Sequence, residues 1–144
     1  MNLDGITCRL LLKEESVPIA DISKELGFDE TRLEYFLEWP QNLAFVAEIN
    51  GEVAGFIYGY TLMSLEDKPQ LFVYSVDVWP KYQNMGIGSK LFQYVVDYSR
   101  KNGFSECFVI TDKGNKRACR VYEKAGGKND YTDEIVYVIK HDDN

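Results

Sequence analysis

Residues 71–101 have the pattern of a strand, a glycine-containing loop and a helix in succession. Leu71–Val78 is rich in β-branched and apolar residues and stops before Pro80, while Ser89–Lys101 carries apolar residues at helical spacing. The loop between them holds two glycines one residue apart. A helix N-terminus that follows glycines offers unpaired N–H groups to an anion such as a pyrophosphate. The stretch therefore predicts a strand–helix unit with an anion site at the start of its helix.

The other predicted elements place this unit in a mixed α/β (α+β) fold. The dipeptide Asn50-Gly51 is a strong tight-turn signal and joins two strands into a β-hairpin. The order of elements predicts a central twisted, mostly antiparallel sheet flanked by helices, with a βαβ unit in its second half. The predicted strands are Ile6–Lys13, Leu43–Ile49, Val53–Met63, Leu71–Val78, Glu106–Thr111 and Glu134–Lys140, and the predicted helices are Glu14–Leu26, Asp29–Glu38, Ser89–Lys101 and Lys116–Ala125.

Length, charge and cysteine content limit the function classes. The 144 residues are expected to form one domain, 1–144. The net charge of -7 disfavours a nucleic-acid partner and suits a cationic small molecule. No apolar run approaches the roughly 20 residues of a membrane span, and Met1–Ile6 has no signal-peptide pattern, so no membrane partner is expected. The three scattered cysteines suggest neither disulfides nor a metal site, and a reducing, cytoplasmic location is expected.

Two motifs resemble those of the GNAT superfamily of N-acetyltransferases. Gln83–Gly88 (QNMGIG) resembles the family's Q/R-x-x-G-x-G/A signature, and Val76–Tyr82 resembles its fourth strand and exit loop. Asn115–Gly126 resembles the N-x-x-A-x-x-x-Y/F-x-x-x-G helix that follows the family's fifth strand. With the element order, the resemblance covers nearly the whole chain. Residues 43–78 also look like the aminoglycoside 3-N-acetyltransferase branch, although the shared N-G-E-V-A-G hairpin is a less specific feature.

The resemblance implies acetyl-coenzyme A as co-substrate. The backbone amides of the glycine loop would receive its pyrophosphate, and the main chain of Val76 and Val78 would pair with the pantetheine arm. Asn115 would bond the pantetheine or a bound water, or would only cap its helix. The implied cofactor-binding residues are Val76, Val78, Gln83, Asn84, Met85, Gly86, Ile87, Gly88, Ser89, Asn115, Ala118 and Tyr122.

The resemblance also implies catalytic roles. Tyr122 would be the general acid that protonates the departing coenzyme A thiolate, the alternative being a tyrosine that only fills the core. The family's acidic position on the fourth strand falls near Ser75, so Asp77, two residues on and on the same sheet face, is the candidate base. Glu66 and Asp67, in the preceding loop, are alternatives for attracting the amine. The cysteines have no paired base, so direct attack in a ternary complex is expected.

The expected function is thus transfer of an acetyl group to a primary amine of a small cationic acceptor. Aminoglycosides, polyamines, amino acids and peptide or protein amines all remain candidate acceptors. The alternatives are a non-catalytic acetyl-coenzyme A sensor and a nucleotide-binding domain, which the missing P-loop lysine disfavours. A homodimer is also expected, because strand edges and apolar residues such as Trp39 need cover.

Overall fold

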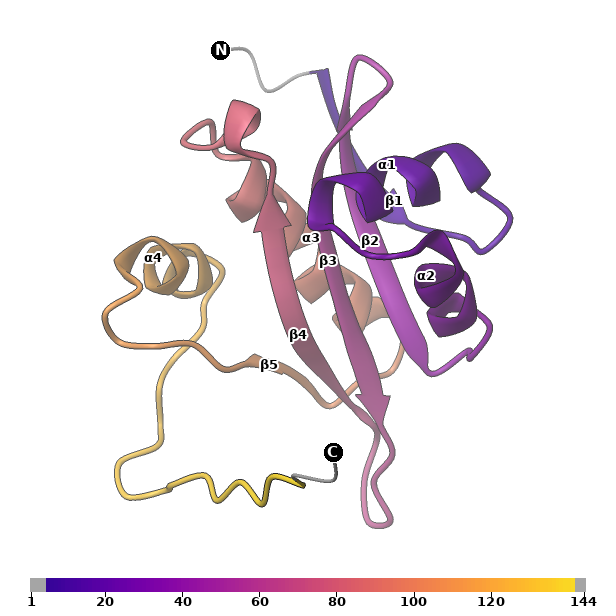
Figure 1. Cartoon of the computed structure of the whole chain (residues 1–144). Coiled ribbons are helices and arrows are strands. Elements are labelled where there is room, and N and C mark those ends of the chain that lie inside the picture. Colours follow the sequence, from indigo (N-terminus) through magenta and orange to yellow (C-terminus); the bar gives the residue numbers. More distant parts are fainter. Residues whose placement is uncertain (1–4, 142–144) are drawn as a thin grey trace.

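The computed structural model describes residues 5–141, so most of the segment Met1–Ile6, for which no signal-peptide pattern is predicted, lies outside it. The described strands form one five-stranded sheet in the order β1-β2-β3-β4-β5 (Figure 1). The first four strands are antiparallel to their neighbours and β5 is parallel to β4. This arrangement confirms the predicted mixed, mostly antiparallel sheet. The strands are β1 Ile6–Leu10, β2 Asn42–Ile49, β3 Glu52–Leu62, β4 Gln70–Val78 and β5 Glu106–Val109, and the helices are α1 Ser16–Leu26, α2 Glu30–Leu37, α3 Ile87–Lys101 and α4 Lys116–Lys124.

Local sequence signals account for several element ends. Asn50 and Gly51 have φ angles of 52° and 80°, as a tight β2–β3 hairpin turn requires. Asp29 caps α2, because its side chain accepts a hydrogen bond of 2.9 Å from the Thr31 N–H. Helix α1 ends at Gly27, which is in the left-handed conformation. Each of these signals acts within four residues of its own position.

Helices cover both faces of the sheet (Figure 1). Helix α3 packs on one face, while α1 and α2 pack on the other. The burial of each large apolar side chain between these layers contributes roughly 1.5–3 kcal/mol to the free energy of folding. The packed centre of the sheet therefore holds the strands that carry the residues at its edge. The core on the α3 side includes Phe45, Ile57, Leu71, Leu91 and Val95, and the core on the α1/α2 side includes Ile19, Ile22, Val46, Phe56 and Trp79.

A bulge in β4 separates the two halves of that strand. The β3–β4 register places Gly59 opposite Val73 and Tyr58 opposite Ser75, so Tyr74 is an extra residue on β4. The two backbones come so close here that a Cβ at Gly59 would overlap the carbonyl of Phe72. Pairing of β4 with β5 ends at this bulge, and Figure 1 shows β5 turning away from β4 beyond it. Within the described chain, the outer edge of β4 from Ser75 onward is therefore unpaired.

The prediction of a last strand over Glu134–Lys140 is wrong. Residues 128–141 form neither strand nor helix and run as an exposed segment below the body (Figure 1). Ile135 is 71% exposed and Tyr137 is 83% exposed. A strand needs a neighbouring edge to satisfy its backbone N–H and C=O groups, and no described residue of this chain supplies one to the segment.

Candidate active site

The glycine loop follows β4 directly, so the N-terminus of α3 lies next to the unpaired end of that strand. A short 3₁₀ turn, Pro80–Tyr82, follows β4, and Asn84 and Gly86 then adopt left-handed φ angles of 64° and 82°. Helix α3 starts at Ile87, and no side chain caps it. The first amides of α3 are thus left to an external acceptor, and the positive end of the helix dipole favours an anion there.

The predicted residues of this loop divide into anchors and ligand-facing backbone. The side chain of Ile87 is buried at 1% exposure, and Met85 packs against the same core. Gly88 lies inside the first turn of α3, where an added Cβ would contact the Val78 side chain at 3.4 Å. The side chains of Ile87 and Met85 therefore anchor the loop in the core.

Gln83 ties the loop to both neighbouring elements. Its Nε2 donates a hydrogen bond of 3.1 Å to the carbonyl of Val78, at the end of β4. Its Oε1 accepts a hydrogen bond of 3.1 Å from Nη1 of Arg117, on α4. Arg117 was missed by sequence reasoning, because no local pattern shows that α4 approaches the loop. The Gln83 amide therefore fixes the spacing between β4 and α4 next to the anion site.

The unpaired end of β4 presents two chemically different faces. Val76 and Val78 pack against the core on the α3 side. On the opposite face, the Ser75 hydroxyl donates a hydrogen bond of 2.9 Å to Oδ2 of Asp77. Both of these polar side chains are half-buried. The sequence prediction that Ser75 and Asp77 share a face is confirmed.

Helix α4 brings Tyr122 towards Asp77. The Tyr122 ring packs on Phe92 of α3 with ring centroids 4.8 Å apart. Burial, together with smaller contributions from Cys119 and the Asp77 carboxylate, raises the pKa of Tyr122 above its ordinary value of 10.0. A raised pKa keeps the phenol protonated at neutral pH, which a proton donor requires. Asn115 caps α4 by accepting a hydrogen bond of 3.1 Å from the Ala118 N–H, so the capping alternative describes at least part of its role.

The structure does not bring Glu66 and Asp67 to this site. Both lie in the exposed loop between β3 and β4, where their backbone N–H groups donate to the Ser64 hydroxyl. Asp77 lies near the other end of the nine-residue strand β4. At about 3.3 Å per residue the loop and Asp77 are separated by roughly 25 Å.

A cluster of aromatic rings flanks Asp77 on its own face of the sheet. Tyr58, Tyr60 and Tyr74 lie with their ring centroids 5.5–6.4 Å apart, and Phe72 stacks on Phe108 at 4.8 Å. Tyr74 is 57% exposed. Burial, followed by Tyr60, Tyr74 and Asp77, raises the pKa of Tyr58. The i, i+2 spacing of the rings in each of β3 and β4 is the signal that could have predicted this shared aromatic face.

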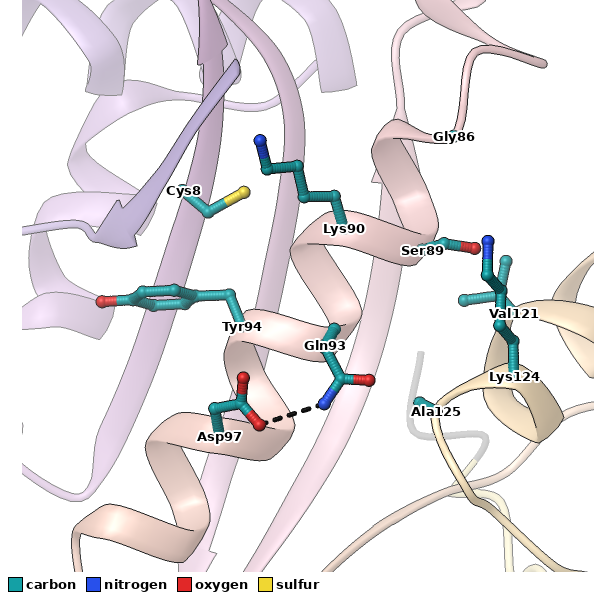
Figure 2. Close-up of a pocket in the computed structure, with 10 residues that line it drawn as sticks. All are labelled: Cys8, Gly86, Ser89, Lys90, Gln93, Tyr94, Asp97, Val121, Lys124 and Ala125. Carbon is teal, nitrogen blue, oxygen red and sulfur yellow. Dashed lines mark hydrogen bonds between the residues drawn. The ribbon is translucent and has the colours of Figure 1, made fainter. Parts of the chain in front are cut away.

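A surface pocket of about 650 Å³ adjoins the start of α3. Figure 2 shows Ser89 and Lys124 projecting into it from α3 and α4, with Gly86 at its upper end. Lys90 also lines the pocket, and its Nζ donates to the carbonyl of Ile6 at 3.2 Å. Two lysines thus line the same pocket as Gly86 and Ser89 at the start of α3.

Residues 5–141 hold neither a metal-binding cluster nor a membrane-spanning helix. No group of three or more His, Cys, Asp or Glu side chains there has a geometry that could hold a metal ion. No helix in that range is long and apolar enough to span a bilayer.

Comparison with known proteins gives matches over most of the chain. Residues 13–127 match the model of the acetyltransferase (GNAT) family. A probable N-acetyltransferase, camello, from Xenopus tropicalis is 31% identical over 107 residues, covering 74% of this chain and 48% of the camello protein. This chain therefore spans about half the length of that relative.

Solved structures share the fold at low sequence identity. An aminoglycoside acetyltransferase from an uncultured soil metagenomic sample, meta-AAC0020 in complex with trehalose, superposes with a TM-score of 0.79 at 22% identity, over 96% of this chain and 100% of that one. The aminoglycoside acetyltransferase AAC(6')-Iy, in complex with a bisubstrate analogue of coenzyme A and acetylneamine, has a TM-score of 0.75 at 18% identity, over 94% of this chain and 98% of that one.

Proposed function

Because the chain belongs to the GNAT acetyltransferase family, we propose that it transfers the acetyl group of acetyl-coenzyme A to a primary amine of a small cationic acceptor. The observation that carries the proposal is the placement of Asp77 and Tyr122. Asp77 lies at the unpaired end of β4, next to the uncapped N-terminus of α3, and Tyr122 lies on α4, which packs against α3. The Asp77 carboxylate makes a small contribution to the raised pKa of Tyr122, after burial and Cys119. A proton acceptor and a proton donor thus lie beside an anion site, as acyl transfer from a coenzyme A thioester to an amine requires.

Acetyl-coenzyme A would lie along the unpaired edge of β4. Its pyrophosphate would accept hydrogen bonds from the backbone N–H groups of Asn84–Ser89, each worth roughly 1.5–3 kcal/mol with a charged acceptor. Its pantetheine arm would pair with the main chain near Val76, as an added strand does. The lysines of the adjoining pocket, Lys90 and Lys124, would add favourable charge. No metal is needed for this mode of binding.

The reaction would proceed by direct attack in a ternary complex. The amine nitrogen forms the new N–C bond with the thioester carbonyl carbon, the C–S bond breaks, and sulfur keeps its electron pair. Asp77 takes the proton that the nitrogen loses, directly or through water, and Tyr122 gives its phenolic proton to the sulfur. Positioning the two reactants together supplies much of the rate gain.

Two of the three cysteines, Cys8 and Cys107, are poor candidates for the nucleophile of an acyl-enzyme. Burial raises the pKa of Cys107 to about 11, and burial also raises the pKa of Cys8. At neutral pH both are therefore thiols, and the thiolate is the nucleophilic form. All three cysteines are free in the described chain, in keeping with our proposal that the protein works in the reducing cytoplasm.

A cationic acceptor suits the face of the sheet that holds Asp77. The carboxylate attracts an ammonium group, and the rings of Tyr58, Tyr60 and Tyr74 offer π faces to a cation or flat apolar faces to a sugar ring. The overall charge of -7 adds long-range attraction. Since two of the solved neighbours are aminoglycoside acetyltransferases, aminoglycosides are the first acceptors to test, followed by polyamines, amino acids and lysine peptides.

Thiol release from acetyl-coenzyme A, measured against that panel, tests the proposal. We expect release that depends on one class of amine and falls in Tyr122→Phe. Tyr35→Phe, which changes a 63% exposed ring on α2, is the matched control. Binding of acetyl-coenzyme A without turnover of any amine would instead favour the sensor alternative. Failure to bind it at all would contradict the proposal.

A further inference from the structure

Aromatic side chains from three neighbouring strands form a continuous surface on one side of the sheet, which we call the aromatic face. Its members are joined by ring contacts with centroids 4.8–6.4 Å apart and are Tyr58, Tyr60, Phe72, Tyr74 and Phe108. Tyr74 is 57% exposed and the other four rings are partly exposed. A contiguous exposed surface of this kind is typical of a binding site.

The bulge in β4 places Asp77 on the same side of the sheet as these rings. Val73 and Val76 both pack against the core on the α3 side. The two residues between them, Tyr74 and Ser75, therefore both lie on the opposite side, as the extra residue of a bulge allows. In a regular strand, residues three apart such as Tyr74 and Asp77 would lie on opposite faces. The bulge reverses this alternation, so the carboxylate of Asp77 adjoins the rings.

The carboxylate nearest to the centre of the aromatic face is that of Asp77. Burial, followed by Tyr60, Tyr74 and Asp77, raises the pKa of Tyr58, so Asp77 lies close enough to act on that phenol. Glu106, at the start of β5, accepts a hydrogen bond of 2.8 Å from the side chain of Gln70, at the far end of β4. A ligand on the described face therefore meets rings along its length and a negative charge at one end.

Helix α2 adds an aromatic wall to this face. The Phe36 ring packs edge-on against Tyr58 and Tyr60, with centroids 5.4 and 5.6 Å apart. The acidic residues Glu34 and Glu38 of the same helix line a different pocket. The contribution of α2 to the aromatic face is thus apolar.

The spacing along β4 suits an ammonium group held a short distance from a ring. Ser75 pairs with Tyr58 in the β3–β4 register, and Asp77 lies two residues further along, roughly 7 Å away. A ligand ring that stacks on Tyr58 or Tyr74 would place an amino group on a two-carbon linker close to Asp77. Stacking between aromatic rings is favourable in offset and edge-on geometries, and both are present within the face itself.

A polycation fits this face less well than a monoamine. Aminoglycosides and polyamines carry several ammonium groups, and the carboxylate of Asp77 can pair with one of them. The remaining ammonium groups would lose water over the rings, which compensate a buried charge less well than a carboxylate does.

We propose that the acceptor is a primary monoamine whose amino group is joined to an aromatic ring by a short linker, and that Tyr74, with Tyr58 and Tyr60, selects it. The ligand ring stacks on these tyrosines while Asp77 receives the ammonium group. The inference rests on the acetyl transfer proposed above and leaves its chemical step unchanged.

Acetylation of a matched set of amines tests the choice of acceptor. Phenethylamine and butylamine each carry one amino group and differ in the ring, while spermidine and an aminoglycoside represent the polycations. We expect kcat/KM for phenethylamine to exceed that for each of the other three by at least about tenfold. More efficient acetylation of a polycation would overturn the inference and leave acetyl transfer itself intact. Equal values for phenethylamine and butylamine would overturn it as well.

Substitutions at Tyr74 test whether the rings make the selection. Tyr74→Ala removes the most exposed ring of the face, so the ratio of kcat/KM for phenethylamine to that for butylamine should fall about tenfold. Tyr74→Phe keeps the ring and should keep the ratio close to that of the wild type. Tyr131→Ala, at a 66% exposed position outside the sheet, is the matched control. An unchanged ratio in a folded Tyr74→Ala variant would contradict selection by this face.

Binding measured without turnover separates failure of this inference from failure of the proposed function. Saturation-transfer NMR on protein saturated with coenzyme A should detect the ring protons of phenethylamine, and the signal should weaken in Tyr74→Ala. Binding of phenethylamine without acetylation of any amine would support the aromatic face as its site and contradict the proposed transfer. Absence of binding would overturn the inference whatever the transfer assay shows.

Discussion

The hydroxyl of Ser75 donates a hydrogen bond of 2.9 Å to Oδ2 of Asp77, on the face of β4 that carries the exposed aromatic rings. Residues two apart on a strand share a face, so the strand itself sets this contact. This hydrogen bond holds one carboxylate oxygen of Asp77. In the function that we propose, the other oxygen would meet the incoming ammonium group, and Ser75 would be a positioning residue for Asp77.

Asp77→Asn should lower kcat by about 10²–10⁴, the usual contribution of a general base, with little effect on the affinity for acetyl-coenzyme A. Steady-state kinetics and calorimetric titration of acetyl-coenzyme A check the two halves of this expectation. Asp67→Asn, in the exposed loop between β3 and β4, is the control. An Asp77→Asn variant with the wild-type kcat would remove Asp77 as the base.

Ser75→Ala should lower kcat by about tenfold, because it removes one hydrogen bond to a charged group, worth roughly 1.5 kcal/mol. Ser75→Thr keeps a hydroxyl and should restore most of the rate. A loss of positioning should lower kcat and leave the KM for the amine nearly unchanged, whereas a packing defect should change both. If threonine rescued nothing while both variants stayed folded, the hydrogen bond would not be the relevant feature.

Tyr122 should set the alkaline limit of the pH–rate profile. Its pKa is raised above 10.0, chiefly by burial, so the phenol stays protonated as the pH rises to 10 and loses its proton only above that value. The wild-type kcat should therefore fall only above pH 10, and Tyr122→Phe should have a lower kcat without this alkaline fall. Profiles of kcat measured between pH 7 and pH 11 in buffers of constant ionic strength check it (a range of about four units around the ordinary tyrosine value). An unchanged alkaline limb in Tyr122→Phe would assign the limb to another group.

Gln83→Ala should raise the dissociation constant for acetyl-coenzyme A and have little effect on the free energy of unfolding. The change removes both the 3.1 Å bond to the Val78 carbonyl and the 3.1 Å bond from Arg117, which together hold the loop at the anion site. Loss of about 1–2 kcal/mol of positioning would raise the dissociation constant by roughly 10-fold. Gln70→Ala, an amide at the start of β4 whose side chain bonds Glu106, is the matched control. Equal affinities for the two variants would show that the bridge is not needed.

Leu91→Ala should cost about 2–5 kcal/mol in the free energy of unfolding, because Leu91 is fully buried between α3 and the sheet. Leu65→Ala, in the exposed β3–β4 loop, should change that free energy by less than about 0.5 kcal/mol. Urea unfolding followed by circular dichroism compares the two. A small loss in Leu91→Ala would mean that the α3 core relaxes around the cavity.

The parts of this protein that sequence alone determined are those with local causes. The Asn50-Gly51 turn and the glycine entry to α3 were predicted, and the cap at Asn115 was one of two alternatives, because each depends on backbone angles or hydrogen bonds within a few residues. The alternation along β4 was also enough to place Ser75 and Asp77 on one face.

Only the tertiary structure decided which distant residues meet. The bulge at Tyr74, where the pairing of β4 with β5 ends, and the Gln83–Arg117 bond both depend on contacts between segments that are distant in the sequence. The segment 134–140 shows the limit most clearly, since its residues favour a strand and yet form none in the described chain. Composition sets the preference for a strand, but a strand forms only where another edge satisfies its backbone hydrogen bonds.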